Sequence, residues 1–170
     1  MAPDDGPLLA AAPQYGAQLW MHLSTLTDSG SFDSRLGGAL LENETAQKAL
    51  IDAIAASMAE KGYQGLDVDF EYLEGRQAAA YTAFIDALRQ RLNPLGWPVI
   101  VALAPKSSAE QRGLLYEAHD YAALSHAVNA VLLMTYEWGY TAGPPMAVAP
   151  LPQVRRVLDY ALTEMAPEKI

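Results

Sequence analysis

The chain has 170 residues, of which 51% are hydrophobic and 18% are charged, an ordinary composition for a folded domain. No apolar run approaches about 18 residues, which excludes a transmembrane helix, and the absence of cysteine excludes disulfides and thiolate metal sites. The formal net charge of −9 argues against a nucleic-acid partner, because nucleic acids select basic patches.

The first elements along the chain should be a short helix and a strand. Residues 1–6 lack the basic segment and the apolar core of a secretory signal, so the sequence predicts no signal peptide. Residues 4–15 predict a short helix, and the apolar run at 18–24 is typical of a strand buried on both faces. His22 lies on that strand, and we interpret it as a histidine with a satisfied hydrogen bond rather than a ligand.

A loop and a long helix should follow. Residues 25–41 are rich in Ser, Thr, Asp and Gly and predict a long loop, and loops after strands often carry ligand contacts. Asn43 is a suitable N-cap for a helix that runs to Lys61. Gly62 stands where a helix C-terminus favours glycine, so the helix should end there.

The next strand carries a row of acidic residues. From Gly65 to Glu71 apolar and acidic residues alternate, which is the period of a β-strand. Asp67, Asp69 and Glu71 should therefore point to one face, about 6.6–7 Å from one to the next. When carboxyl groups lie close together and are partly buried, the pKa of at least one of them is raised. We interpret the row as part of an active site rather than as an exposed acidic face.

The rest of the chain repeats the alternation of helix and strand. The sequence predicts helices at 76–91, at 120–128 and from Pro152 onward, a polar loop at 106–119 and a Gly/Pro-rich loop at 139–150. Short buried strands alternating with helices indicate βαβ units and a parallel sheet. We expect an α/β fold whose four parallel strands are neighbours in sequence order. Their predicted ranges are 18–24, 65–71, 98–104 and 130–137.

Two motifs carry a family resemblance. Residues 64–71, Gln-Gly-Leu-Asp-Val-Asp-Phe-Glu, resemble the Asp-Gly-x-Asp-x-Asp-x-Glu signature of glycoside hydrolase family 18, the chitinase family. Gln64 replaces the first Asp of that signature. Residues 134–139, Met-Thr-Tyr-Glu-Trp-Gly, resemble the family's Met-x-Tyr-Asp motif, with Glu137 in place of Asp. Two spaced motifs together are far more specific than either alone.

The resemblance extends over nearly the whole chain. Residues 21–27 and 133–150 are similar to one branch of the family, the bacterial spore-cortex and cell-wall N-acetylglucosaminidases, which are often fused to LysM repeats. A complete (β/α)8 (TIM) barrel usually needs about 250 residues. We therefore expect residues 1–170 to be a single partial catalytic domain of this family, with the third to sixth strands of its barrel.

The resemblance implies roles for four residues. Glu71 matches the family's general acid and base, Asp69 would hold the acetamido N–H of the substrate, and Asp67 would support Asp69. Tyr136 would donate its hydroxyl to the acetamido oxygen, or else be a structural tyrosine at a strand end. Asp69 and Glu71 project from one strand and cannot straddle a sugar ring. The resemblance therefore implies that the N-acetyl group of the substrate acts as the nucleophile.

Three more residues are candidates for substrate binding, namely Met134, Glu137 and Trp138. Glu137 keeps the charge of the family's Asp but moves it by one methylene, and Trp138 could stack on a sugar or simply contribute to packing. Metal binding is the competing chemistry, because the three acidic residues of the row offer oxygen ligands to Mg²⁺ or Ca²⁺. The row is too linear to complete an octahedral shell, so we expect no metal.

The resemblance implies a retaining glycosidase that acts, without a cofactor, on N-acetylglucosamine-containing glycans such as peptidoglycan or chitin. The alternative is an inactive fragment or a carbohydrate-binding module, because part of the barrel is missing, including a tryptophan that floors the family's sugar site. The exposed sheet edges predict self-association. By resemblance the protein would work in the cell wall, in the spore or outside the cell, with a glycan and neither nucleic acid nor membrane as its partner.

Overall fold

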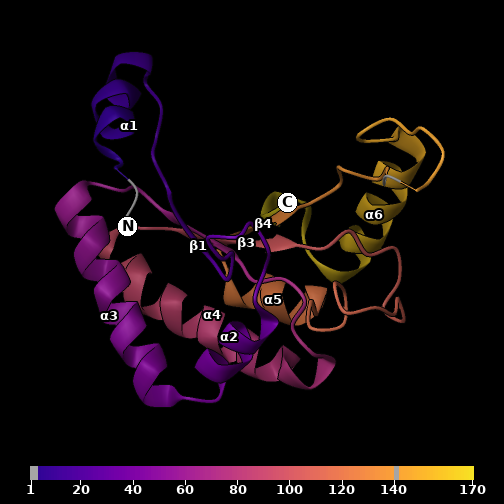
Figure 1. Ribbon diagram of the computed structural model, residues 1–170, viewed down its shortest axis with the longest axis horizontal. Coiled ribbons are helices and arrows are strands. Elements are labelled where there is room, and N and C mark those ends of the chain that lie inside the picture. Colours follow the sequence, from indigo (N-terminus) through magenta and orange to yellow (C-terminus); the bar gives the residue numbers. More distant parts are fainter. Residues whose placement is uncertain (1–3, 140–141) are drawn as a thin grey trace.

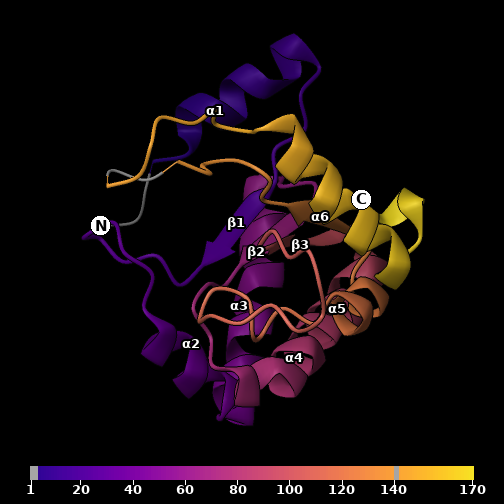
Figure 2. The ribbon, with the colours of Figure 1, turned by 90° about the vertical axis from the view of Figure 1, so that its right-hand side faces the viewer.

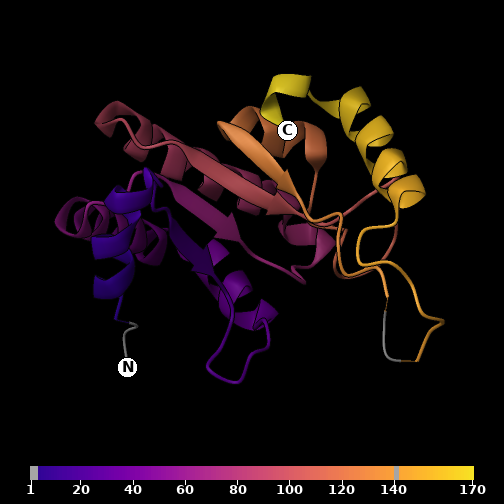
Figure 3. The ribbon, with the colours of Figure 1, turned by 90° about the horizontal axis from the view of Figure 1, so that it is seen from above.

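One parallel sheet organises the fold. The structure, a computed structural model, describes residues 4–139 and 142–170; Tyr140 and Thr141, in the loop predicted at 139–150, lie outside the described residues. The strands form the sheet in the order β1-β2-β3-β4, and their arrows run the same way in Figure 3. Their ranges are β1 (Met21–Ser24), β2 (Leu66–Asp69), β3 (Val99–Leu103) and β4 (Ala130–Leu133). The predicted α/β fold, parallel pairing and strand order are confirmed, although each strand is shorter than predicted.

Six α-helices lie around the sheet in the part of the chain that the structure describes. In Figure 1, α2, α3, α4 and α5 lie below the strands, whereas α1 and α6 lie above them at opposite ends. Figure 2 shows the same separation from the side. Among the described residues, none of these helices is long and apolar enough to cross a membrane. Their ranges are α1 (Gly6–Ala11), α2 (Ser34–Leu41), α3 (Glu44–Lys61), α4 (Ala78–Leu92), α5 (Tyr121–Ala127) and α6 (Leu151–Glu164).

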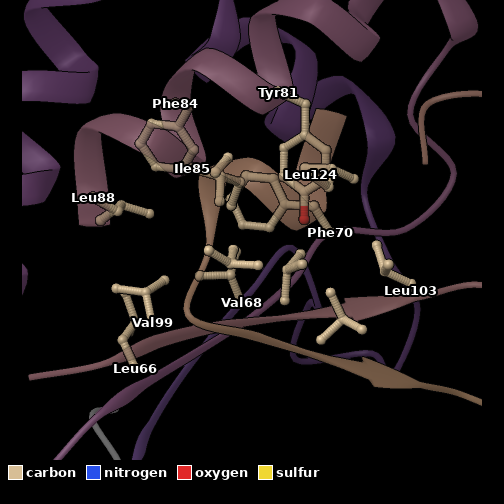
Figure 4. Close-up of a cluster of buried hydrophobic side chains, with 14 of the residues drawn as sticks. Leu66, Val68, Phe70, Tyr81, Phe84, Ile85, Leu88, Val99, Leu103 and Leu124 are labelled. Atoms are coloured by element: carbon tan, nitrogen blue, oxygen red, sulfur yellow. The ribbon is translucent and has the colours of Figure 1, made fainter. Parts of the chain in front are cut away.

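The core lies between the sheet and the helices below it. Leu66, Val68 and Phe70 are at most 2% exposed and point toward α4. Phe70 stacks on Tyr81 and on Phe84, with ring centroids 5.7 and 5.9 Å apart (Figure 4). Burying each large apolar side chain stabilises the fold by roughly 1.5–3 kcal/mol. This burial fixes the face of β2 that meets the helices and so turns its acidic residues to the other face.

The predicted loop at 25–41 is wrong in its second half, which forms α2. Asp33 caps this helix, because its carboxylate accepts hydrogen bonds from the backbone N–H groups of Arg35 and Leu36. Two glycines hid the helix from sequence reasoning, since glycine has low helix propensity. A Cβ on Gly37 would lie 2.8 Å from the side chain of Leu73, and one on Gly38 would collide with the side chain of Gln77, so close packing explains both glycines.

The prediction that the first strand is buried on both faces is also wrong. β1 pairs only with β2 among the described residues, so it is an edge strand. Met21 and Leu23 contact the core, but the side chain of His22 on the other face is 51% exposed. At the opposite edge, Leu132 of β4 is 39% exposed. Within the described residues the sheet is therefore open at both edges.

Candidate active site at the carboxyl ends of the strands

A cleft of about 460 Å³ lies at the carboxyl ends of β2, β3 and β4. The structure brings six of the seven predicted site residues to this cleft, namely Asp69, Glu71, Met134, Tyr136, Glu137 and Trp138. Asp67, the seventh, lies one pleat further back on β2 and is not part of the lining. Sequence reasoning missed Phe32, Tyr72 and Tyr116, which also line the cleft. Only Tyr72 carried a signal, because it directly follows the acidic row.

The acidic row forms as predicted on the face of β2 away from the core. The side chains of Asp67 and Asp69 are 24% and 14% exposed, and one carboxylate oxygen of each is buried without a hydrogen-bond partner among the described residues. Burial raises the pKa of Asp69, and the charge of Asp67 raises it further while His22 opposes both effects. The two unpaired oxygens leave this part of the row ready to accept hydrogen bonds.

Glu71 follows the end of β2 and has the most perturbed acidic group in the cleft. Burial raises the pKa of its carboxyl to about 7, with further contributions from the charges of Asp69 and Glu137. A carboxyl group with this pKa holds its proton near neutral pH and can still release it. Glu71 therefore has the protonation behaviour that a general acid and base needs.

His22 binds the row from the neighbouring strand. Its Nδ1 lies 2.8 Å from an oxygen of Asp67, and its Nε2 lies 4.0 Å from an oxygen of Asp69. The hydrogen bond to Asp67 raises the pKa of His22, against the opposing effect of partial burial. The predicted hydrogen bond is confirmed, although the strand that carries His22 is not buried.

The variant Asp67→Asn should lower the pKa of His22, because it removes the charge at the other end of the 2.8 Å hydrogen bond. We expect the wild-type imidazole to titrate above pH 6.5 and the variant's midpoint to lie at lower pH. Histidine NMR signals followed over pH measure both midpoints. His126, exposed on α5, is the internal control, and its signal should not respond to the substitution. An unchanged midpoint for His22 would contradict the assigned pairing.

The segment after β4 adds Tyr136, Glu137 and Trp138 to the cleft. Tyr136 is about half exposed. Burial raises the pKa of its hydroxyl, with the charge of Asp69 as the next cause, so the hydroxyl stays protonated and can donate a hydrogen bond. Glu137 has φ of 58°, a left-handed conformation that is uncommon for a residue other than glycine. Tyr72, which also lines the cleft, has the same φ of 58°. Such strained backbone is found preferentially at functional sites.

A buried histidine that sequence reasoning missed supports the end of β2. His119 accepts a hydrogen bond from the backbone N–H of Ala104 at Nδ1 (2.9 Å) and donates from Nε2 to the carbonyl of Phe70 (3.0 Å). Burial lowers the pKa of His119 to about 4, which keeps the ring neutral and suited to this pattern. The ring ties the residue before Glu71 to the end of β3. It therefore helps to fix the position of Glu71.

Metal binding by the acidic row is the alternative chemistry that the sequence offered. In the part of the chain that the structure describes, no three histidine, aspartate or glutamate side chains come together in a way that could hold a metal ion. Asp67 pairs with His22, and Asp69 and Glu71 line the cleft. The chemistry that the described residues offer is that of carboxyl groups and a phenol.

Comparison with known proteins identifies a family and two groups of relatives. The family model for glycosyl hydrolases family 18 matches residues 24–170. The cortical fragment-lytic enzyme of Bacillus subtilis (strain 168) is 43% identical over 150 residues, which cover 88% of this chain and 35% of that protein. The enzyme of the same name from Bacillus anthracis is 34% identical over 168 residues, 99% of this chain and 39% of that protein. This chain thus spans little more than a third of these relatives.

Solved structures agree with the sequence comparison. The crystal structure of the spore cortex-lytic enzyme SleL from Bacillus megaterium QM B1551 is 38% identical, with a TM-score of 0.92, and the match covers all of this chain and 38% of that one. A chitinase from Chromobacterium violaceum ATCC 12472 has a TM-score of 0.90 at 21% identity, covering 99% of this chain and 53% of that one. The second likeness shows a shared fold.

Proposed function

The chain belongs to glycosyl hydrolases family 18, and from this membership we propose that its 170 residues form part of one catalytic domain that cleaves N-acetylglucosamine-containing glycans. The observation that carries the proposal is the cleft carboxyl of Glu71, with its pKa of about 7, beside Asp69 and Tyr136. The curated relatives are named for lysis of cortical fragments. Cortex peptidoglycan, in the spore or cell wall, is therefore the proposed substrate.

The proposed reaction proceeds with retention and with assistance from the substrate. Glu71 donates its proton to the glycosidic oxygen as the bond to the anomeric carbon breaks. The carbonyl oxygen of the substrate's own N-acetyl group attacks that carbon from the other face and forms a cyclic oxazolinium ion. Glu71, now ionised, takes a proton from water as the water attacks the same carbon and opens the ring. The new hydroxyl stands on the original face.

The remaining cleft residues would position the acetamido group. Asp69 would accept the acetamido N–H, which gains positive charge as the ring closes, and Tyr136 would donate its hydroxyl to the acetamido oxygen. Asp67, held by His22, would support the charge of Asp69 from behind. A nucleophilic carboxylate on the opposite face of the sugar is not needed, because the N-acetyl group takes that role.

Substrate binding would fall to the segment after β4. Met134 and Trp138 offer apolar surface to a sugar ring, and Glu137 offers a charged acceptor to its hydroxyls. Hydrogen bonds to an ionised acceptor are among the stronger polar contacts. The half-exposed Tyr136 lies between these residues in sequence, which would place the binding and catalytic groups on one short segment.

The open sheet favours a second candidate function, a carbohydrate-binding module or an inactive fragment. β1 and β4 are edges within the described residues, and the relatives are more than twice as long as their matched segments. A cleft built from one part of a barrel could still hold a sugar without the precise positioning that catalysis requires. Both a catalytic domain and a binding module would bind a sugar, and only the catalytic domain would cleave it.

A chimaera tests the proposed reaction. In the chimaera, the 150 matching residues of this chain replace their counterpart in the Bacillus subtilis cortical fragment-lytic enzyme. The rest of that enzyme then supplies the remainder of the fold. We expect the chimaera to cleave cortex peptidoglycan and N-acetylglucosamine oligomers and to leave the matching de-N-acetylated oligomers intact, because these lack the attacking carbonyl. Chromatography of the products measures both rates. Equal cleavage of acetylated and de-N-acetylated oligomers would contradict substrate assistance.

A further inference from the structure

A second hollow adjoins the catalytic cleft on the side of α6. It has a volume of about 250 Å³ and shares Pro105 and Trp138 with the cleft. Its other walls come from the segment after β3 and from α6, and the residues that matter below are Gln111, Gln153 and Arg156. A glycan bound in the cleft would therefore have a neighbouring space for the next unit or for a substituent.

Two polar groups of this hollow are buried and unpaired. The indole Nε1 of Trp138 and the side-chain oxygen of Gln153 have no hydrogen-bond partner among the described residues. A buried donor or acceptor without a partner is costly, so such groups call for an explanation. One group is a donor and the other an acceptor, and a ligand that carries both an acceptor and a donor would satisfy them together.

The hollow also contains an arginine without an ion pair. No salt bridge of Arg156 is present within residues 4–139 and 142–170. Glu110 and Asp159 line a further hollow that Arg156 also borders, and neither lies within ion-pair distance of it. Arg156 follows Gln153 by three residues on α6, so the two side chains share one face of the helix.

Gln111 adds a further donor. Its side-chain oxygen accepts hydrogen bonds from the backbone N–H (2.7 Å) and the hydroxyl (3.2 Å) of Ser107. The oxygen is thus occupied, whereas no partner of the amide nitrogen is found in the described part of the chain. The hollow therefore offers donors from Trp138, Gln111 and Arg156 and an acceptor from Gln153. This set matches an amide followed by a carboxylate.

We propose that this hollow is a subsite for an acidic, amide-bearing substituent of the glycan, with Arg156 as the residue that binds its carboxylate. The proposal rests on the proposed function, which places a glycan in the adjoining cleft. The lactyl-amino acid chain of an N-acetylmuramic acid unit has the required amide and carboxylate. Oligomers of N-acetylglucosamine have no carboxylate, so the subsite would favour peptidoglycan over chitin.

The acidic surroundings of the cleft explain why a cation is needed in the hollow. The chain carries a net charge of −9, and the cleft holds Asp69, Glu71 and Glu137. An acidic ligand would be repelled by these groups unless a cation lay close to its own charge. A guanidinium group binds a carboxylate with two parallel hydrogen bonds, which lysine cannot reproduce. Arg156 is the charged residue that lines the hollow beside Trp138.

Binding to the purified 170-residue chain tests the subsite. The probes are a disaccharide of N-acetylglucosamine and N-acetylmuramic acid carrying a dipeptide, the same compound with its carboxylates amidated, and N,N′-diacetylchitobiose. NMR titration follows the indole N–H signals of the three tryptophans, and Trp138→Phe identifies the signal of interest. The variants are Arg156→Ala, Arg156→Lys and, as the matched control, Arg155→Ala, because Arg155 is the preceding exposed arginine and lies outside the hollow.

We expect the acidic probe to shift the Trp138 indole signal and to bind about 10-fold more weakly, or weaker still, to Arg156→Ala. Arg156→Lys should recover part of the loss, and Arg155→Ala should bind as the wild type does. Diacetylchitobiose should bind all four proteins equally. If the acidic and amidated probes bind alike and Arg156→Ala changes neither, the subsite is wrong while the proposed function stands. If no probe binds the wild-type chain, the subsite proposal fails, and cleavage by the chimaera decides the proposed function separately.

Discussion

Glu71→Gln in the chimaera should reduce the rate of glycan cleavage by about 10²–10⁴-fold, the usual contribution of a general acid and base. Glutamine keeps the size of the side chain but cannot donate a proton to the leaving oxygen or take one from water. Binding of N-acetylglucosamine oligomers should change little, because the proton transfer occurs in the transition state. Rates and KM values over a range of oligomer concentrations measure the two effects separately.

The pH dependence of this prediction follows from the raised pKa of Glu71. The acid must be protonated for the first step, so the rate should fall as pH rises through about 7. Glu60→Gln is the matched control, because Glu60 is exposed on α3 and is not part of the cleft lining. A chimaera in which Glu71→Gln and Glu60→Gln both retain the full rate would overturn the assignment of Glu71.

The raised pKa of Glu71 makes the stability of the fold decrease as pH rises. A carboxylate whose pKa is lowered by folding has the opposite effect. The folded chain binds the Glu71 proton more tightly than the unfolded chain, whose glutamate titrates near 4.5. Stability is therefore lost as pH rises from about 4.5 through about 7, because the unfolded state then binds fewer protons than the folded state. The group that serves the reaction is thus one that destabilises the fold at neutral pH.

Local patterns in the sequence were sufficient to predict most of the fold. Strict alternation from Gly65 to Glu71 predicted both faces of β2, and Asn43 and Gly62 marked the two ends of α3. The missed helix α2 shows the limit of such patterns. Gly37 and Gly38 lower the helix propensity of that segment, and the close contacts with Leu73 and Gln77 that explain them come from residues about 36–39 positions away.

The candidate site was predictable where a motif carried it and not where distant segments meet. The acidic row was identified by its alternation and by the family motif, and the segment from Met134 to Trp138 by the second motif. Each of the two is a continuous stretch of sequence. His119 lies in a loop with no distinctive pattern, yet its two hydrogen bonds join residues 70 and 104. The unpaired groups of Trp138 and Gln153 are likewise invisible before the chain is folded. Contacts of this kind depend on the tertiary structure and leave no periodic signal.

The isolated 170-residue chain should cleave N-acetylglucosamine oligomers at least about 10²-fold more slowly than the chimaera. The cleft residues lie at the ends of β2 and β4, and β4 is an edge within the described residues, so its end lacks support on one side. A displacement of about 1 Å in a catalytic group can cost 10²-fold in rate. Parallel assays of the two proteins at equal concentration measure the difference, with Glu71→Gln in each as the blank.

The open edges should also cause self-association of the isolated chain, because unpaired strands present a row of free backbone donors and acceptors. Leu132 adds an exposed apolar side chain to the β4 edge. Size-exclusion chromatography at several concentrations should show oligomers, and Leu132→Lys should shift them toward monomer, since an edge lysine disfavours strand pairing. An isolated chain that stays monomeric and cleaves at the rate of the chimaera would contradict both expectations. It would mean that these four strands alone hold Glu71, Asp69 and Tyr136 firmly enough for catalysis.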